Sequence, residues 1–125
     1  MRARVIVDTS VWIDFFRGKL AASQKEALIV LIEAEEVAIT DVIKHELLIG
    51  ARTRKDFLFL QDSLSALEEI SLEPDLKPVF NRFGFDLKMQ GLVGKYTDLS
   101  IAFLAQKHGL QIYSLDRYFS DTLIP

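Results

Sequence analysis

Short apolar runs alternate with amphipathic segments along the chain, a pattern typical of strands that alternate with helices. The runs that predict buried strands are residues 4–7, 37–39, 70–72 and 111–115. Between them, apolar residues recur at intervals of three and four, which predicts helices over 10–16, 22–35, 41–50, 55–67, 74–89 and 98–108. This alternation predicts an α/β fold: a short parallel sheet with helices on both faces, joined by right-handed crossovers.

Capping residues stand where several of these helices should begin or end. Thr9 or Ser10 can cap the first helix, and Thr40 can cap the helix over 41–50. Gly109 follows the last helical segment and can end it, because glycine adopts the left-handed conformation without strain.

Length and composition bound the class of protein. A chain of 125 residues has the size of one domain, so we expect a single domain over 1–125. Hydrophobic residues make up 50%, and the 6 glycines raise the apolar share to about 55%, against about 45–50% for an average soluble domain. The longest unbroken apolar run is 27–32, far shorter than the ~18 residues that a membrane span needs. We therefore expect a cytoplasmic protein with no membrane partner.

Several catalytic classes are excluded by residues that the chain lacks. With no cysteine there is no disulfide, thiolate zinc site or cysteine nucleophile. The pair His45-Glu46 is not followed by the second histidine of a zinc-protease motif. The 15 basic and 18 acidic residues give a net charge of −3, which neither indicates nor excludes nucleic-acid binding. If the chain is an enzyme, we expect carboxylates to be its catalytic groups.

Four carboxylates stand in apolar settings. Asp8 and Asp116 end predicted strands, where sites of parallel sheets form, and Glu46 and Asp98 lie on helix faces that should be buried. Two carboxylates ~4 Å apart repel by about 4 kcal/mol at an effective dielectric constant of 20. A cluster of four therefore takes up protons or holds a cation. Oxygen ligands alone suit Mg²⁺ or Mn²⁺, and such ions promote phosphodiester cleavage.

Each carboxylate also has a structural interpretation. Asp8 and Asp98 could each cap a helix, Asp116 could belong to an ordinary turn, and Glu46 could form a buried ion pair. None of these explains the set of four.

The acids lie in four ordered segments that resemble the PIN-domain ribonucleases, most closely the VapC-type toxins of prokaryotic toxin–antitoxin pairs. These segments are residues 7–14, 46–50, Gly91 with 98–102, and 114–119. The resemblance implies a single PIN domain that hydrolyses RNA and holds one or two Mg²⁺ ions, with Mn²⁺ as a substitute. It implies the catalytic and metal-binding residues Asp8, Glu46, Asp98 and Asp116, and a supporting shell of hydroxyls from Thr9, Ser10 and Ser114. Many members have threonine at the position of Ser114, so the hydroxyl is kept.

The resemblance also implies partners: an RNA substrate, a cognate antitoxin protein laid in a groove, and a second copy in a homodimer. Exposed apolar surface for such contacts would explain the apolar excess. Candidates for the antitoxin groove are Trp12, Phe15 and Phe16, which could equally be core residues. Candidates for contact with the RNA backbone are Arg52, Arg54 and Lys55, which could equally form a solvated face.

Other functions stay open. A stand-alone RNA-processing PIN nuclease would have the same site as a toxin. A phosphorelay receiver domain should have an acidic pair after its first strand and a lysine after its last, but Val7 precedes Asp8 and no lysine follows Asp116. A haloacid-dehalogenase-type phosphatase needs a second aspartate where Ser10 stands. A non-catalytic α/β binding module is a further alternative.

Overall fold

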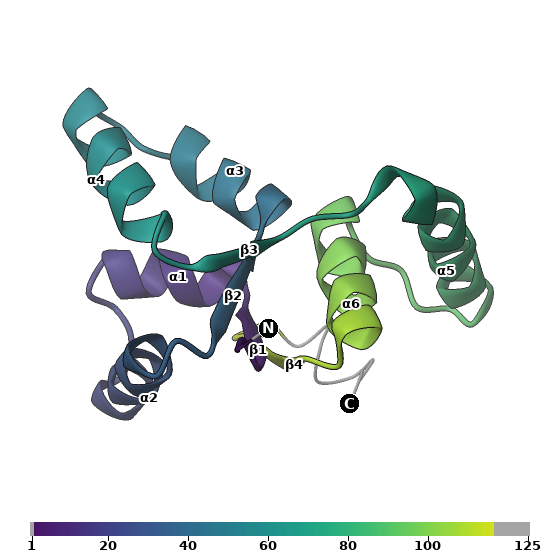
Figure 1. The fold of residues 1–125 in the computed structure, drawn as a ribbon, viewed down its shortest axis with the longest axis horizontal. Helices are drawn as coiled ribbons and strands as arrows, with labels where there is room; N and C mark the ends of the chain where they lie inside the picture. The colour runs from purple at the N-terminus through teal and green to yellow at the C-terminus, as the bar shows by residue number, and fades with distance from the viewer. Residues whose placement is uncertain (1, 117–125) are drawn as a thin grey trace.

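The computed structural model describes residues 2–116 and contains a four-stranded parallel sheet in the order β3-β2-β1-β4 (Figure 1). The strands are β1 (Val5–Val7), β2 (Val37–Thr40), β3 (Glu68–Ile70) and β4 (Gln111–Tyr113). The helices are α1 (Thr9–Phe16), α2 (Ala22–Glu33), α3 (Asp41–Ile49), α4 (Arg54–Leu64), α5 (Lys77–Met89) and α6 (Tyr96–His108), with a short 3₁₀ turn over Pro74–Leu76. The predicted α/β fold is confirmed.

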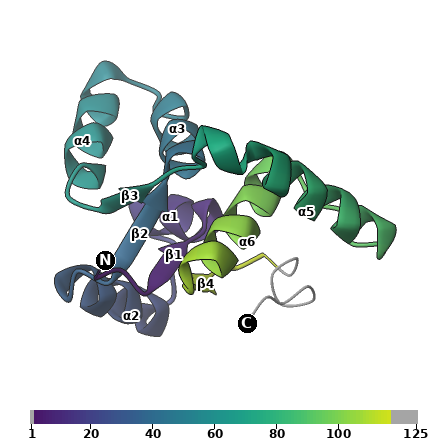
Figure 2. The ribbon, with the colours of Figure 1, turned by 45° about the vertical axis from the view of Figure 1, so that its right-hand side comes forward.

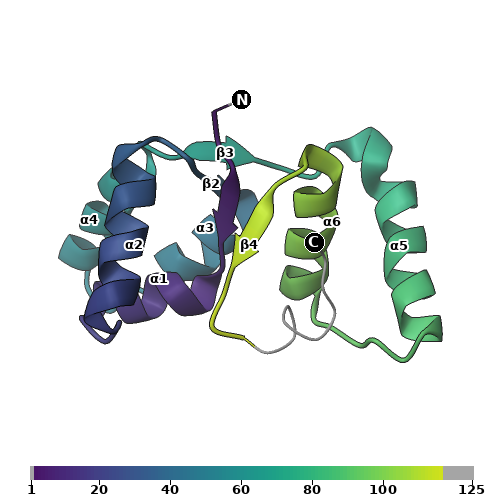
Figure 3. The same ribbon diagram turned by 90° about the horizontal axis from the view of Figure 1, so that it is seen from below.

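Helices cover both faces of the sheet, as the alternating pattern predicts. Figure 3 shows α1 and α2 on one side of the strands and α6, backed by α5, on the other. Helices α3 and α4 lie side by side (Figure 2), and α3 also contacts α1 and α6. The layers therefore enclose β1 and β2, which are buried along their whole length.

Helix α6 is the most deeply buried helix of the described chain. Every residue from 100 to 105 is buried, because the helix lies between the sheet and α5. The aromatic rings of Phe80 and Phe83 on α5 pack edge-on against Phe103, with centroids 5.3 and 5.4 Å apart. Gly109 ends α6 with a φ of +66°, which confirms the predicted stop.

Strand-to-helix junctions form in the same way after β1 and β2. Thr40 caps α3 as predicted: its buried hydroxyl accepts a hydrogen bond from the Ile43 backbone N–H at 3.1 Å. The prediction that Thr9 or Ser10 caps α1 is wrong, since Asp8 holds that position and accepts from the Thr9 N–H at 2.8 Å. The two helices thus start directly at the carboxyl ends of neighbouring strands.

Element boundaries differ from the prediction by up to three residues, since α4 ends at Leu64 instead of 67 and α5 begins at Lys77 instead of 74. Strand β3 covers Glu68–Ile70 instead of 70–72, and only its last residue is buried. An edge strand tolerates charged residues because one of its sides is free, so its apolar pattern is weak. Strand β4 ends at Tyr113, two residues before the predicted end. Helix α2 stops at Glu33, two residues early.

The described helices include none that is long and apolar enough to cross a membrane.

Trp12 belongs to the hydrophobic core, so its predicted place in an exposed groove is wrong. Its exposed fraction is 2%. Its ring stacks on Phe16 with centroids 5.8 Å apart and meets the edge of Phe15 at 6.1 Å. Phe15 and Phe16 are partly buried and pack against the same core. The spacing of these three rings is therefore the inner stripe of α1, and the core alternative holds for Trp12.

We expect the fluorescence of Trp12, the single tryptophan, to have a blue-shifted maximum in the free protein and to resist quenching by iodide, because the indole has almost no contact with water. Unfolding in urea should shift the emission to the red and make it quenchable. A red-shifted, quenchable emission from the folded protein would contradict the placement of Trp12 in the core.

Candidate active site

Asp8 follows the central strand β1 and is 5% exposed. Its oxygen Oδ1 accepts the Thr9 backbone N–H at 2.8 Å. Its oxygen Oδ2 accepts the hydroxyls of Ser10 at 3.0 Å and Ser114 at 2.7 Å. These three bonds offset the cost of burying the carboxylate. Since a carboxylate has about four lone-pair sites, one is left for a further ligand.

The two serines that contact Asp8 also hold the chain that follows β4. The Ser10 hydroxyl accepts the Leu115 backbone N–H at 3.2 Å, and the Ser114 hydroxyl accepts the Asp116 N–H at 2.8 Å. Each hydroxyl therefore donates to Asp8 and accepts from this segment. The network ties the backbone of Asp116 to the buried carboxylate. Asp116 itself is exposed at the end of the described chain.

Glu46 is partly buried on α3, and threonine hydroxyls bind both of its carboxylate oxygens. The hydroxyl of Thr9 donates to Oε1 at 3.0 Å, and that of Thr97 donates to Oε2 at 3.0 Å. Within residues 2–116 Glu46 forms no ion pair, so the alternative of a buried ion pair is wrong there. The nearby Lys44 pairs instead with Glu69 at 3.0 Å. Glu46 is thus fixed between the starts of α1 and α6.

The hydrogen bonds from Thr9 and Thr97 to Glu46 differ from the buried apolar surroundings that the pattern of α3 predicts. Ile49, three residues after Glu46 on the helix face that should be buried, is 67% exposed, so the face around Glu46 is a polar border of the core. Thr97 is a site residue that the sequence analysis missed. Its position directly before Asp98 is the one signal that could have identified it.

Asp98 is the third residue of α6 and is partly buried. One carboxylate oxygen accepts the Lys95 backbone N–H at 3.4 Å, so the capping interpretation also holds. Burial raises the pKa of Asp98 above its usual value, and the backbone N–H of Lys95 lowers it. The charges of Asp116 and Asp8 raise this pKa further. The charges of Asp8, which follows β1, and of Asp116, which follows β4, therefore both act on the carboxylate of Asp98.

The four acids lie at one edge of the sheet without forming a tight cluster. Within the described residues no three Asp, Glu or His side chains come close enough together to form a ready metal-binding group. Thr9 links two of the acids directly, since its backbone N–H binds Asp8 while its hydroxyl binds Glu46. The hydroxyls expected to support the site, those of Thr9, Ser10 and Ser114, all contact one of the acids.

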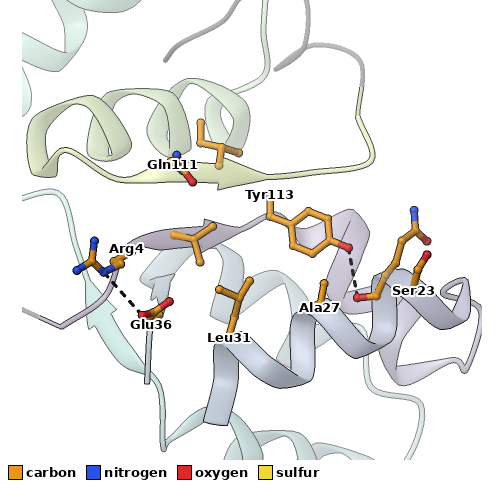
Figure 4. Close-up of a pocket in the computed structure, with 10 residues that line it drawn as sticks. Arg4, Ser23, Ala27, Leu31, Glu36, Gln111 and Tyr113 are labelled. Atoms are coloured by element: carbon orange, nitrogen blue, oxygen red, sulfur yellow. Dashed lines mark hydrogen bonds and ion pairs between the residues drawn. The ribbon is translucent and has the colours of Figure 1, made fainter. Parts of the chain in front are cut away.

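A separate cavity of about 510 Å³ lies between α2 and the strands β1 and β4 (Figure 4). The Tyr113 ring points across it to α2, and its hydroxyl donates to the Gln24 carbonyl at 3.4 Å. Arg4 and Glu36 form a distant ion pair of 3.7 Å at the other end. None of the four candidate acids lines this cavity.

The three cations predicted to contact RNA do not line this cavity. Arg52, Arg54 and Lys55 are all exposed near the start of α4. Arg52 lines a second hollow, between α1 and α4, whereas the other two do not.

The profile of the PIN domain family matches residues 5–123, nearly the whole chain. The chain belongs to the PIN-domain family. This PIN domain is 27% identical over 119 residues to ribonuclease VapC11 of Mycobacterium tuberculosis, an alignment that covers 92% of this chain and 88% of that protein. It is equally similar to VapC ribonuclease Mb1587 of Mycobacterium bovis.

Solved structures share the fold of this PIN domain. A chain of the VapBC2 complex from Rickettsia felis, bound to promoter DNA, aligns with a TM-score of 0.77 and 20% identity over 94% of this chain and 91% of that chain. A chain of the DNA-bound VapBC complex from Salmonella typhimurium aligns with a TM-score of 0.78 and 18% identity, covering 98% of this chain and 93% of that chain.

We expect Asp98→Asn to raise the melting temperature of the metal-free protein at pH 7. The raised pKa of Asp98 means that its charged form is less favourable in the folded state than in the unfolded chain. Above the folded pKa this penalty is complete, and below the ordinary value of 3.8 both states are protonated and it vanishes. Thermal unfolding in EDTA between pH 7 and pH 4 measures the difference, which should shrink as the pH falls. If the melting temperature of Asp98→Asn exceeded that of the wild type by more at low pH than at pH 7, the raised pKa of Asp98 would be contradicted.

Proposed function

We propose that this PIN domain is a metal-dependent endoribonuclease and the toxin of a toxin–antitoxin pair, acting on RNA in the cytoplasm. The observation that carries the proposal is the hydrogen-bond network around the buried Asp8 carboxylate, in which Ser10 and Ser114 donate to Asp8 and accept the backbone N–H groups of Leu115 and Asp116. Similarity to ribonuclease VapC11 supports the reaction. The shared fold with chains of VapBC complexes supports the partner.

The donor set suits Mg²⁺ or Mn²⁺. All candidate ligands are carboxylate oxygens, which these hard cations prefer, and Asp8 keeps one lone-pair site. Burial is the main cause of the raised pKa of Asp98, and a divalent cation would offset the smaller contribution from the charges of Asp116 and Asp8. We assign the metal-binding role to Asp8, Asp98 and Asp116, with Glu46 completing the set.

Bound divalent ions supply an activated water and stabilise charge on the phosphodiester oxygens. The chain's own residues position these groups. The serine network holds Asp116 beside Asp8, and the two threonines hold the Glu46 carboxylate in one orientation. Such fixed orientation avoids reorganisation during the reaction. The remaining lone pairs of Glu46 can accept a hydrogen bond from the attacking water.

Exposed apolar side chains support the proposed antitoxin contact and homodimer. Val79 on α5 is 56% exposed, Met89 on the same helix is 64% exposed, and Val93 after α5 is 77% exposed. Such surface is stabilised when a partner covers it. A stand-alone RNA-processing nuclease is the second candidate, since it would use the same acids. A small neighbouring reading frame with a DNA-binding start and an apolar tail would favour the toxin.

We expect the purified wild-type chain to cleave single-stranded RNA in Mg²⁺ or Mn²⁺. Asp98→Asn should lose this activity by more than about 100-fold, because loss of a residue that only hydrogen-bonds to a metal ligand already costs about 10- to 100-fold. Thr97→Val, which removes one hydrogen bond to Glu46, should lose about 10- to 100-fold. Gel assays with labelled RNA measure both.

Asp86→Asn is the matched control, because Asp86 is an exposed carboxylate on α5 whose one ion pair within residues 2–116 is with Arg82. It should cleave at the wild-type rate. An Asp98→Asn protein that cleaved RNA as fast as this control would refute the assignment of Asp98 to the active site.

We also expect Mg²⁺ or Mn²⁺ to raise the melting temperature of the wild-type protein, since an ion that binds only the folded state stabilises it by mass action. EDTA should reverse the shift, and Asp98→Asn should reduce it. NaCl at equal ionic strength is the control. Equal responses to NaCl and MgCl₂ would indicate screening of charges without a metal site.

A further inference from the structure

A hollow of about 660 Å³ lies between the end of α1 and the connection from α3 to α4. Its wall carries the cations Arg17, Lys19 and Arg52 and one carboxylate, Asp56. Within residues 2–116 none of these three cations forms an ion pair. In a chain of net charge −3, the hollow is therefore a local concentration of unpaired positive charge.

An exposed aromatic ring forms part of the same wall. Phe59 is 61% exposed, and its ring meets that of Phe16 at right angles, with centroids 6.4 Å apart and an interplanar angle of 85°. The contact with Phe16 holds the ring while most of its surface faces solvent. A fixed aromatic face beside unpaired cations is the combination that binds single-stranded nucleic acid, because bases stack on the ring and phosphates pair with the cations.

The hollow adjoins the candidate active site along α3. Gly50, which lines the hollow, lies one turn beyond Glu46, and its backbone N–H donates to the Glu46 carbonyl at 3.2 Å. Four residues of α-helix advance about 6 Å. A short single strand can therefore extend from the acids to the hollow.

We propose that this hollow is a subsite for one nucleotide of a single-stranded RNA substrate, with the base on Phe59 and phosphates paired with Arg17 and Arg52. The proposal rests on the proposed function and adds the residues that position the substrate. A protein-docking groove would be the other use of the hollow. The charge of its wall favours RNA, since the centres of protein interfaces are depleted in charged residues.

Binding of a fluorescein-labelled 12-nucleotide RNA to the full chain in EDTA tests the subsite without cleavage. By fluorescence anisotropy we expect Phe59→Ala to weaken binding about tenfold, and Phe59→Trp, which keeps an aromatic face, to restore it. Arg17→Ala with Arg52→Ala should reduce the slope of log K against log salt by about 1.4, the loss of two phosphate contacts on a single strand.

Two matched controls lie outside the hollow. Phe85→Ala removes another ring of similar exposure, 55%, from α5. Arg2→Ala removes an arginine whose side chain is 75% exposed and which precedes β1, so that it lies at the opposite end of that strand from Asp8. Both should bind RNA as the wild type does.

A set of RNAs with one abasic position each locates the stacked base. In the wild-type protein one position should lose affinity when its base is removed. In Phe59→Ala the same RNA should bind as well as the intact one, because the ring that reads the base is absent.

The outcomes separate this proposal from the function on which it rests. Wild-type cleavage of RNA with unchanged binding by the Phe59 and arginine variants would overturn the subsite and leave the nuclease intact. Failure of the wild-type protein to cleave or bind RNA would refute both. Variants that lose a co-purifying protein partner while their RNA affinity and salt slope stay unchanged would assign the hollow to protein docking, and the RNA proposal would be wrong.

Discussion

The buried carboxylate of Asp8 is the constraint on which the candidate site depends. At 5% exposure the carboxylate has little contact with water and depends on protein donors, which come from the start of α1 and from Ser114 after β4. The same bonds that stabilise the charge therefore bring the chain around Ser114 and Asp116 to the carboxyl end of β1. The same hydrogen bonds therefore stabilise the junction between β1 and α1 and assemble the candidate site.

Hydroxyl groups carry out a comparable task around Glu46. Thr9 and Thr97 belong to helices on opposite faces of the sheet, and each donates to one oxygen of this carboxylate. Helix α3 is thereby joined to both layers at the level of the acids. A site whose side chains are held by such hydrogen bonds is rigid, which would suit the proposed binding of ions that tolerate little deviation in ligand geometry.

Negative and positive charges are separated along α3. The acids gather where the helix faces the sheet edge, and one turn beyond Glu46 the hollow presents Arg17 and Arg52. This polarity fits a polyanionic substrate: its reacting phosphate must approach carboxylates, which repel it without bound cations, while its neighbouring phosphates are attracted nearby. In the proposed subsite the exposed ring of Phe59 would stack on a base without regard to its hydrogen-bonding edges.

The order of strands and helices, the buried central strand and the cap at Thr40 could be predicted from the sequence, because periodicity and capping are local properties. So could the candidates Asp8 and Asp98, which stand beside apolar runs. Burial of Trp12 could not be predicted, since one stripe of rings serves a core or a groove equally well.

The role of Thr97 and the limits of β3 depended on contacts between residues far apart in sequence. Thr97 meets Glu46 across 51 positions, and β3 takes its register from β2 through the pair Thr40 and Ile70. Local sequence determined which segments are helices, strands and charged ends. Only the tertiary structure decided which hydroxyl serves which carboxylate, because hydrogen bonds over such separations exist only after the layers have packed.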